Sequence, residues 1–500
     1  MELRFFGATG TTTGSCHMIV AGGYNVLLDC GFYQGRREES YERNSRCAFD
    51  PKSVHAVVQS HAHVDHSGKL PMLVRQGFAG RIHATSATRD LCDALLRDSA
   101  HIMVSDARFL NERRARRAHS ELAHASHGER SAADAHGSAP NGNRNSDPEV
   151  LLPAHEIVPL YVEEHVAATM RRFVDHAHGD WFQAAPNMRF RLHEAGHILG
   201  ATWIEGEIQD ELGTKRLVFT GDYGRKHQPI LRDPEPLLPA DVFISESTYG
   251  NRVHPPMADM DVELAAAVNR LAARGRGRLL IPAFAVGRTQ NVLYSLSEIY
   301  RRKEAPPIDI VVDSPLATLA TRIVLNHHEC FDDEALRAYE RMESDASFRS
   351  HLRFTDTVDE SKALNTDPRP LIIVSASGMM ETGRILHHLA WNIDKPETEI
   401  LVVGFQADHT LGRKLVQGAR EVYVLGMRRT VRARITSMQG FSAHADKNGL
   451  IEALEPHAST AKALFLVHGE EDQRKPLGRE LATRGFRRVE QPTGPEAYRV

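Results

Sequence analysis

The sequence predicts an α/β fold in two parts, in which a domain built on a parallel sheet flanked by helices interrupts a metal-binding domain. Two observations lead to this prediction. Between about residues 241 and 390, apolar strand segments alternate with helical segments, a pattern typical of a parallel sheet covered on both faces. On both sides of that stretch, His and Asp residues stand at the ends of apolar runs, which indicates one metal site built from distant segments.

Length and composition set broad limits. The 500 residues are too many for one ordinary core and suggest two or three domains. A net charge of −4 excludes a basic coat over the whole surface, so a polyanion would have to bind a local patch. The five scattered cysteines favour reduced thiols and a cytoplasmic protein. We expect no signal peptide at the N-terminus, and no apolar run reaches the length of about 20 residues that a membrane helix needs.

The first 100 residues are predicted to form short strands and turns. Apolar runs at 3–10, 24–31 and 54–60 end in glycine or polar residues. The third run continues into the sequence QSHAHVDHSG at 59–68, which places three histidines and one aspartate within six positions.

Residues 118–148 have a different composition. They are rich in Ala, Ser, Gly and Asn and contain few large apolar side chains, so they bury too little surface to offset the entropy of ordering. We predict a flexible insertion there. Just before it, Arg113, Arg114, Arg116 and Arg117 form either a solvated helix face or a contact to a phosphate backbone.

The alternating pattern begins with a strand at 240–250 that ends on polar residues. Segments 278–300, 308–325 and 370–390 then each read as a strand, a loop of small residues and a helix. Sites in such sheets lie where loops leave the carboxyl ends of the strands. Short strands return at 399–406, 422–426, 432–446 and 463–472.

The sequence HAHVDH at 61–66 supplies imidazole nitrogens and a carboxylate, which are good zinc ligands. One tetrahedral ion could not easily use His61, His63, Asp65 and His66 from so tight a turn, so two adjacent metals suit them better. Further candidates stand just beyond other apolar runs: His197, Asp222 and His468.

These motifs resemble those of the metallo-β-lactamase superfamily, whose first motif matches Asp29 in LLDCG. Further motifs resemble the β-CASP nucleases, which include the pre-mRNA 3′-end processing endonuclease and prokaryotic ribonucleases. They are ESTYG (246–250), PAFAVGRTQ (282–290), SASGMMETGR (375–384), GFSAHAD (440–446) and LVHGEED (466–472). The resemblance covers nearly the whole chain and implies a discontinuous αββα sandwich with an inserted β-CASP domain.

The implied boundaries are 1–246 and 401–500 for the two parts of the metallo-β-lactamase domain and 247–400 for the β-CASP domain. The resemblance also implies two Zn²⁺ per chain. His61, His63 and His197 would bind one ion, Asp65, His66 and His468 the other, and Asp222 would bridge them. Asp29 would stand behind the ligands and orient the histidine loop.

The implied function is a zinc-dependent ribonuclease that hydrolyses RNA phosphodiester bonds through a hydroxide held by two metals. Asp65, His444 and Glu246 would be catalytic, with His444 as general acid and Glu246 tuning it. A histidine at position 468 resembles the RNA-processing members, whereas DNA-repair members carry valine there. Endonuclease and exonuclease cleavage both remain open.

Candidate phosphate contacts are Ser375, Ser377, Gly378 and Arg288. The loop that contains the first three lies between a strand and a helix and could present hydroxyl and N–H groups at the helix N-terminus. A plain tight turn is the alternative for this loop, and a buried structural arginine is the alternative for Arg288.

Three other functions compete with a ribonuclease. The metal motifs alone also fit a small-molecule hydrolase acting on a thioester or lactone, or a DNA nuclease. A non-catalytic scaffold would be expected to lack some ligands, whereas all seven are present. The expected partner is single-stranded RNA, with no membrane association, and a homodimer is possible.

Overall fold

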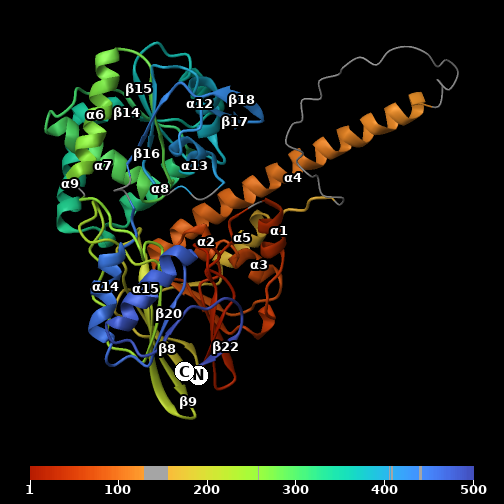
Figure 1. The fold of residues 1–500 in the computed structure, drawn as a ribbon, viewed down its shortest axis with the longest axis vertical. Helices are drawn as coiled ribbons and strands as arrows, with labels where there is room; N and C mark the ends of the chain where they lie inside the picture. The colour runs from red at the N-terminus through yellow and green to blue at the C-terminus, as the bar shows by residue number, and fades with distance from the viewer. Residues whose placement is uncertain (36, 129–155, 257, 405, 407–408, 439–441) are drawn as a thin grey trace.

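The computed structural model describes residues 1–35, 37–128, 156–256, 258–404, 406, 409–438 and 442–500. Figure 1 shows two bodies, a lower one that contains both chain termini and an upper one formed by the middle of the chain. The lower body holds two seven-stranded sheets and the upper body a six-stranded sheet.

The first sheet of the lower body has the order β22-β1-β2-β3-β4-β5-β6. Its last strand, β22, pairs with β1, which brings the two termini side by side (Figure 1). β3, β4, β5 and β6 run parallel. The strands are β1 (Glu2–Phe5), β2 (His17–Ala21), β3 (Tyr24–Leu28), β4 (Ala56–Val58), β5 (Arg81–Ala84), β6 (Phe173–Asp175) and β22 (Ala497–Arg499).

The second sheet has the order β21-β20-β11-β10-β9-β8-β7. β10, β11 and β20 are parallel neighbours, so their carboxyl ends meet at one edge although β20 comes from the end of the chain. The strands are β7 (Phe182–Ala185), β8 (Met188–Glu194), β9 (Thr202–Asp210), β10 (Gly213–Phe219), β11 (Val242–Ser245), β20 (Ala463–Leu466) and β21 (Val489–Glu490).

The two sheets face each other across a core that includes Phe5, Leu28, Phe190 and Phe465. Helices cover the outer faces: α3 packs on the first sheet through Leu70 and Leu73, and α14 and α15 pack on the second. These layers form an αββα sandwich. The helices of this body are α1 (Arg37–Ser45), α2 (Val64–Ser67), α3 (Leu70–Arg75), α4 (Ser86–Gly128), α5 (Glu163–Met170), α14 (Lys447–Leu454) and α15 (Glu471–Thr483).

The upper body is built on a wholly parallel sheet of order β14-β13-β15-β12-β16-β19. Its central strands are buried throughout, as expected for a sheet covered on both faces. The strands are β12 (Arg278–Pro282), β13 (Ile310–Val312), β14 (Leu352–Phe354), β15 (Leu371–Ser375), β16 (Thr398–Val402) and β19 (Arg434–Ser437).

Residues from α6 and α7 fill the core on one face of this sheet, and residues from α12 and α13 fill it on the other. A two-stranded hairpin, β17 (Glu421–Val424) and β18 (Met427–Thr430), packs beside α12 and α13. The helices are α6 (Ala258–Arg274), α7 (Arg288–Arg301), α8 (Pro315–Asn326), α9 (Asp333–Ser344), α10 (Ala346–His351), α11 (Val358–Ala363), α12 (Arg384–Asn392) and α13 (Leu411–Val416).

The predicted α/β class and the αββα sandwich with an inserted parallel-sheet domain are confirmed. The sequence placed the end of that insertion at residue 400. This position falls inside β16, and β19 returns to the same sheet. Because β19 belongs to the sheet of the inserted unit, we now place the end of that unit after the last residue of β19, Ser437.

Two predictions near the N-terminus need correction. The first 100 residues form helices as well as strands, namely α1, α2, α3 and the start of α4. The flexible insertion was predicted to begin at residue 118, but α4 continues to Gly128 and projects beyond the body (Figure 1). No glycine or proline interrupts residues 81–127, and strong helix formers such as Ala, Arg and Leu are frequent there. The rest of the predicted insertion, 129–148, lies outside the described residues.

Among the residues that the structure describes, no helix combines the length and the apolar character that crossing a membrane requires.

Candidate metal centre

The histidine loop starts where β4 ends and continues into α2. The carboxylate of Asp29 anchors its first turn: Oδ1 accepts a hydrogen bond from the Ser60 backbone N–H at 2.8 Å, and Oδ2 accepts one from the Ser60 hydroxyl at 2.9 Å. Asp29 itself follows β3 with φ +62, a left-handed conformation that turns its side chain out of the strand direction. The parallel pair β3 and β4 therefore delivers Asp29 and the loop to the same edge.

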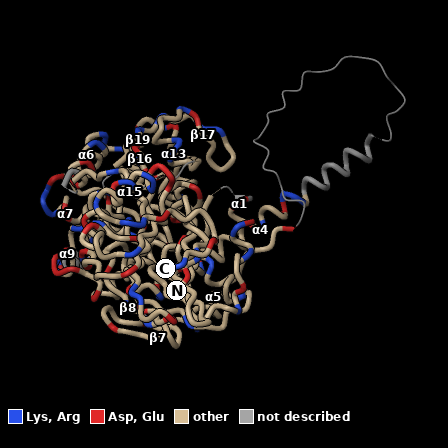
Figure 2. Tube along the Cα trace, turned by 60° about the horizontal axis from the view of Figure 1, so that its bottom comes forward, with Lys and Arg blue, Asp and Glu red and all other residues tan. Residues whose placement is uncertain are grey.

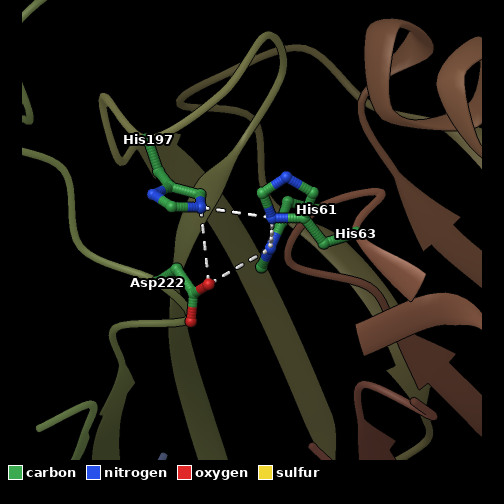
Figure 3. A group of neighbouring side chains, drawn as sticks. All are labelled: His61, His63, His197 and Asp222. Carbon is green, nitrogen blue, oxygen red and sulfur yellow. Dashed lines mark hydrogen bonds and ion pairs between the residues drawn. The ribbon is translucent and has the colours of Figure 1, made fainter. Parts of the chain in front are cut away.

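One group of side chains gathers His61, His63, His197 and Asp222 (Figure 3). His61 Nε2 lies 3.2 Å from His63 Nδ1, and His63 Nδ1 lies 3.3 Å from His197 Nε2. Asp222 Oδ2 lies 3.4 Å from Nε2 of both His61 and His197. His197 comes from the loop after β8, and Asp222 follows β10.

A second group gathers Asp65, His66 and His468. His66 Nε2 lies 3.1 Å from His468 Nε2, which lies 3.5 Å from Asp65 Oδ2. Asp222 also reaches this group, because its Oδ1 lies 3.2 Å from His66 Nε2. One oxygen of Asp222 thus faces each group, which is the arrangement expected of a bridging carboxylate.

The spacing of these atoms fits metal coordination. A tetrahedral zinc with bonds of about 2.0–2.1 Å separates two nitrogen ligands by about 3.3 Å. The neighbouring nitrogens within each group are about that far apart. In the first group three imidazole nitrogens converge, and a hydrogen bond between two of them cannot account for the third. In addition, buried Asp222 Oδ1 accepts no hydrogen bond from the described residues. The donor set is therefore suited to hold metal ions.

The charge of the centre supports the same conclusion. Burial lowers the pKa of His61, and it lowers the pKa of His63 to about 3, so both are neutral imidazoles at pH 7. Burial also lowers the pKa of His66, but the charges of Asp222 and Asp29 outweigh this effect and raise it well above its usual value. The charges of Asp222 and Asp29 therefore favour a cation at this place in the centre, which an imidazolium or a metal ion can supply.

Other side chains hold the ligands from behind. Asp29 Oδ2 accepts a hydrogen bond from His66 Nδ1 at 2.7 Å, a contact by which a carboxylate can orient an imidazole. The Thr248 hydroxyl lies 3.0 Å from His468 Nδ1, and the Ser60 hydroxyl lies 3.0 Å from His61 Nδ1. Fixing the far nitrogen in this way directs the other nitrogen of each ring to the centre.

His444 and Glu246 form a pair at the edge of the centre. His444 Nδ1 lies 3.0 Å and 3.1 Å from the two Glu246 oxygens, and its Nε2 lies 3.8 Å from Asp222 Oδ2. Glu246 is fully buried and also accepts a hydrogen bond from the Tyr223 backbone N–H at 2.7 Å. Burial lowers the pKa of His444, but the charges of Glu246 and Asp222 outweigh it and raise the pKa to about 9.

Sequence reasoning missed four residues that support the site. Ser60 and Thr248 orient ligands, and Tyr223 positions Glu246 through its backbone. His254 places its ring nitrogen Nε2 3.2 Å from the His444 carbonyl oxygen and its ring edge-on to Tyr249. Ser60 belongs to the quoted histidine loop, and Thr248 to ESTYG, so the motifs contained a signal for these two. The link between His254 and His444 joins segments 190 residues apart and has no local signature.

The predicted phosphate loop differs from expectation. Ser377 and Gly378 were placed at a helix N-terminus, but α12 begins at Arg384 with Gly383 as its N-cap. Ser375 is buried and its hydroxyl donates a hydrogen bond to the Asp313 carbonyl at 2.7 Å. A side chain at Gly378 would lie 2.9 Å from the Phe284 ring, so this glycine serves close packing. Before α12 the chain turns at Met380 and Gly383, whose φ angles are +61 and +80.

Arg288 begins α7 and is buried. Burial lowers its pKa to about 10, an effect opposed by the nearby Tyr249 of the ESTYG motif. The preceding Gly287 lies against Ile198, the residue after His197. Arg288 therefore stands where the inserted domain meets the loop that carries His197.

Comparison with known proteins identifies the family. The model described as the metallo-beta-lactamase superfamily matches residues 9–258, half of the chain. The Beta-Casp domain matches residues 289–415, and the Zn-dependent metallo-hydrolase RNA specificity domain matches 428–490. The chain belongs to the β-CASP group of the metallo-β-lactamase superfamily. The predicted resemblance and the predicted class of enzyme, a metallo-hydrolase, are confirmed.

This β-CASP protein is similar to several named proteins. It is 31% identical to Ribonuclease TTHA0252 of Thermus thermophilus over 489 residues, which cover 97% of each chain. It is 26% identical to the RNase J-like protein of Methanocaldococcus jannaschii, over 94% of this chain and 93% of that one. It is 28% identical to Transcription termination factor FttA of Methanothermobacter thermautotrophicus, covering 91% of this chain but 65% of that longer protein.

Among solved structures, a protein of unknown function from Enterococcus faecalis matches the β-CASP protein with a TM-score of 0.52 at 11% identity, over 99% of each chain. At this identity the likeness shows the fold alone.

Proposed function

We propose that the protein is a zinc-dependent ribonuclease that hydrolyses RNA phosphodiester bonds. The observation that carries the proposal is the geometry at Asp222, which faces both ligand groups and lies 3.8 Å from the free nitrogen of His444. Two metal sites and an acid thus converge on one carboxylate.

The first zinc would be held by His61, His63 and His197, the second by Asp65, His66 and His468, and both by Asp222. When bound, such a pair supplies an activated water nucleophile at neutral pH and neutralises charge on the scissile phosphate. The spacing of the nitrogens, the bridging position of Asp222 and the neutral state of His61 and His63 support this assignment.

His444 would supply the proton that the leaving oxygen takes up when the P–O bond breaks. Its Nδ1 is occupied by Glu246, so the proton on Nε2 points towards Asp222 and the centre. Asp222, Glu246 and His444 could in principle hold a metal themselves. However, both Glu246 oxygens already lie at hydrogen-bond distance from His444 Nδ1, which favours the role of an acid and its partner.

Arg288 is the predicted phosphate contact with neighbours at the site, because Tyr249 acts on its pKa and the preceding Gly287 lies against Ile198 of the His197 loop. We propose that it meets the RNA backbone there. The positions of Ser375 and Gly378 favour structural roles for both, and Ser377 keeps its hydroxyl at 3.2 Å from the Glu381 backbone N–H.

RNA is the proposed substrate for two reasons. Relatives of nearly the same length are named as ribonucleases, and the C-terminal family model is described as an RNA specificity domain. In addition, His468 occupies a position where a histidine resembles the RNA-processing members of the family. Single-stranded RNA, cytoplasmic location and a homodimer remain predictions.

Parallel assays separate the candidate activities. The protein is incubated with end-labelled single-stranded RNA, DNA of the same sequence and a chromogenic thioester, in zinc and in excess chelator. We expect RNA cleavage that zinc supports and the chelator abolishes, with slower or no turnover of the other two. Thioester hydrolysis without RNA cleavage would establish the small-molecule alternative, and preferential cleavage of DNA would establish a DNA nuclease.

Glu246→Gln tests the tuning of His444. Glutamine keeps a hydrogen-bond acceptor but removes the charge that raises the pKa of His444. An acid must be protonated to act, so activity is lost as pH rises through its pKa. We expect the alkaline limb of the kcat profile to move to lower pH in this variant. An alkaline limb at an unchanged pH would show that Glu246 does not tune the acid.

A further inference from the structure

A groove on the inserted domain lies outside the metal centre. It runs between α12 and the β17–β18 hairpin, has a volume of about 440 Å³, and combines aromatic, apolar and cationic side chains. Figure 1 shows these elements on the side of the inserted domain opposite α6 and α9. The groove is lined by His387, Ala390, Trp391, Asp394, Lys395, Leu425, Met427 and Arg429.

Several apolar side chains of the groove are exposed. Trp391 is 55% exposed, Leu425 46% and Met427 49%. On the same hairpin, Val422 and Val424 are buried in the core of the domain, and their cross-strand partners Arg429 and Met427 share that face of the hairpin. Large apolar side chains gathered at one place on the surface mark an interaction site.

The tip of the hairpin strengthens this argument. Leu425 and Gly426 form its two-residue loop, and both have positive φ, +51 and +77. Such a loop normally carries Asn, Asp or Gly, which tolerate this conformation. A leucine is unfavourable for the turn, so its exposed side chain is better explained by a contact that it makes with a partner.

The charge around the groove is positive, whereas the whole chain carries −4. Lys395 Nζ lies 5.8 Å from the centroid of the Trp391 ring. Arg429 lines the groove with its Nε lacking a hydrogen-bond partner among the described residues. Exposed Arg432 follows close by, its backbone N–H bonded to the Ile393 carbonyl. Asp394 is the one acidic residue in the lining.

We propose that this groove binds single-stranded RNA, with Trp391 as a platform for a stacked base and Lys395 and Arg429 as phosphate contacts. The proposal rests on the proposed ribonuclease function and adds a second RNA contact to it. Stacking on an aromatic side chain beside cations is how proteins hold single strands without reading sequence.

A second copy of this chain fits the groove less well. In a two-fold dimer the same surface meets itself, so Lys395 and Arg429 of both copies would be gathered in one interface. Like charges brought together in an interface disfavour it. A flexible polyanion complements the same cations.

Binding is tested with labelled oligouridylate of about 30 and about 6 nucleotides, lengths above and near the usual site size of one single-strand module. Fluorescence anisotropy is read in chelator so that the RNA is not cut. We expect Trp391→Ala to weaken binding of the long RNA roughly 5- to 100-fold, the usual worth of one stacked base, while Trp391→Phe stays near wild type. Arg429→Gln should make the dependence of RNA affinity on salt concentration less steep, by the equivalent of about one phosphate contact.

Trp181→Ala is the matched control. Trp181 also lies beside arginines: the centroid of its ring is 4.5 Å from Arg189 Cζ and 4.8 Å from Arg191 Cζ. It stands next to β7, at the far edge of the second sheet. This variant should bind RNA like wild type. Equal affinity of Trp391→Ala and wild type for the long RNA would overturn the proposal. A change in the molar mass of Trp391→Ala, measured by light scattering, together with unchanged RNA affinity would overturn it as well.

Failure of this proposal is distinct from failure of the ribonuclease function. If the groove is not used, Trp391→Ala binds and cuts RNA as wild type does. If the enzyme is not a ribonuclease, the wild type itself leaves RNA uncut in zinc.

Discussion

Replacing His468 with alanine is expected to remove one zinc equivalent and nearly all RNA hydrolysis. His468 Nε2 lies 3.1 Å from His66 Nε2 and 3.5 Å from Asp65 Oδ2. Its loss would leave the ion proposed for this group with too few protein ligands. A metal ion contributes several kcal/mol to stabilising the transition state, which corresponds to a rate loss of about 10³-fold or more. Elemental analysis and single-turnover cleavage measure the two effects.

His457→Ala is the control for this variant. His457 is also a buried histidine of the C-terminal segment, but it stacks on Phe243 away from the ligands. It should keep both zinc ions even if its free energy of unfolding falls. A full zinc content in His468→Ala would contradict the ligand assignment.

Replacing His444 with alanine should leave both zinc ions bound and slow cleavage by about 10²- to 10⁴-fold, the usual worth of a positioned acid. The expectation follows from the position of His444: its Nδ1 is taken by Glu246, and its Nε2 approaches Asp222 from outside the two ligand groups. The measurement is the rate of RNA cleavage at saturating substrate, with zinc content determined on the same sample.

Substrates with an activated leaving group provide the control for His444. A leaving group that needs no proton should be cut by His444→Ala at nearly the wild-type rate. Near-normal cleavage of ordinary RNA by this variant would remove His444 from the mechanism.

The sequence was sufficient to predict the fold class and the members of the candidate centre. An apolar run followed by a polar residue is visible in the sequence itself, as before Asp222, Glu246 and His468. In the structure, the parallel neighbours β10, β11 and β20 place those three ends at one sheet edge. The order of the strands in that sheet has no local signature, because it depends on pairing between segments far apart in the chain.

Other features depended on tertiary context. Composition alone predicted a flexible segment from residue 118, whereas the uninterrupted helix formers before Gly128 extend α4 through its first part. The SASGMM loop has the small residues of a phosphate loop, but Gly378 is required by packing against Phe284. The contact of His254 with His444, 190 residues away, could not be read from the neighbours of His254 in sequence.

The most direct test of the account is an anomalous-scattering experiment at the zinc edge on crystals of the zinc-loaded protein. The account predicts two anomalous peaks on either side of Asp222, one contacting His61, His63 and His197 and the other contacting Asp65, His66 and His468. A single peak, or peaks that leave Asp222 in contact with one ion or none, would contradict it.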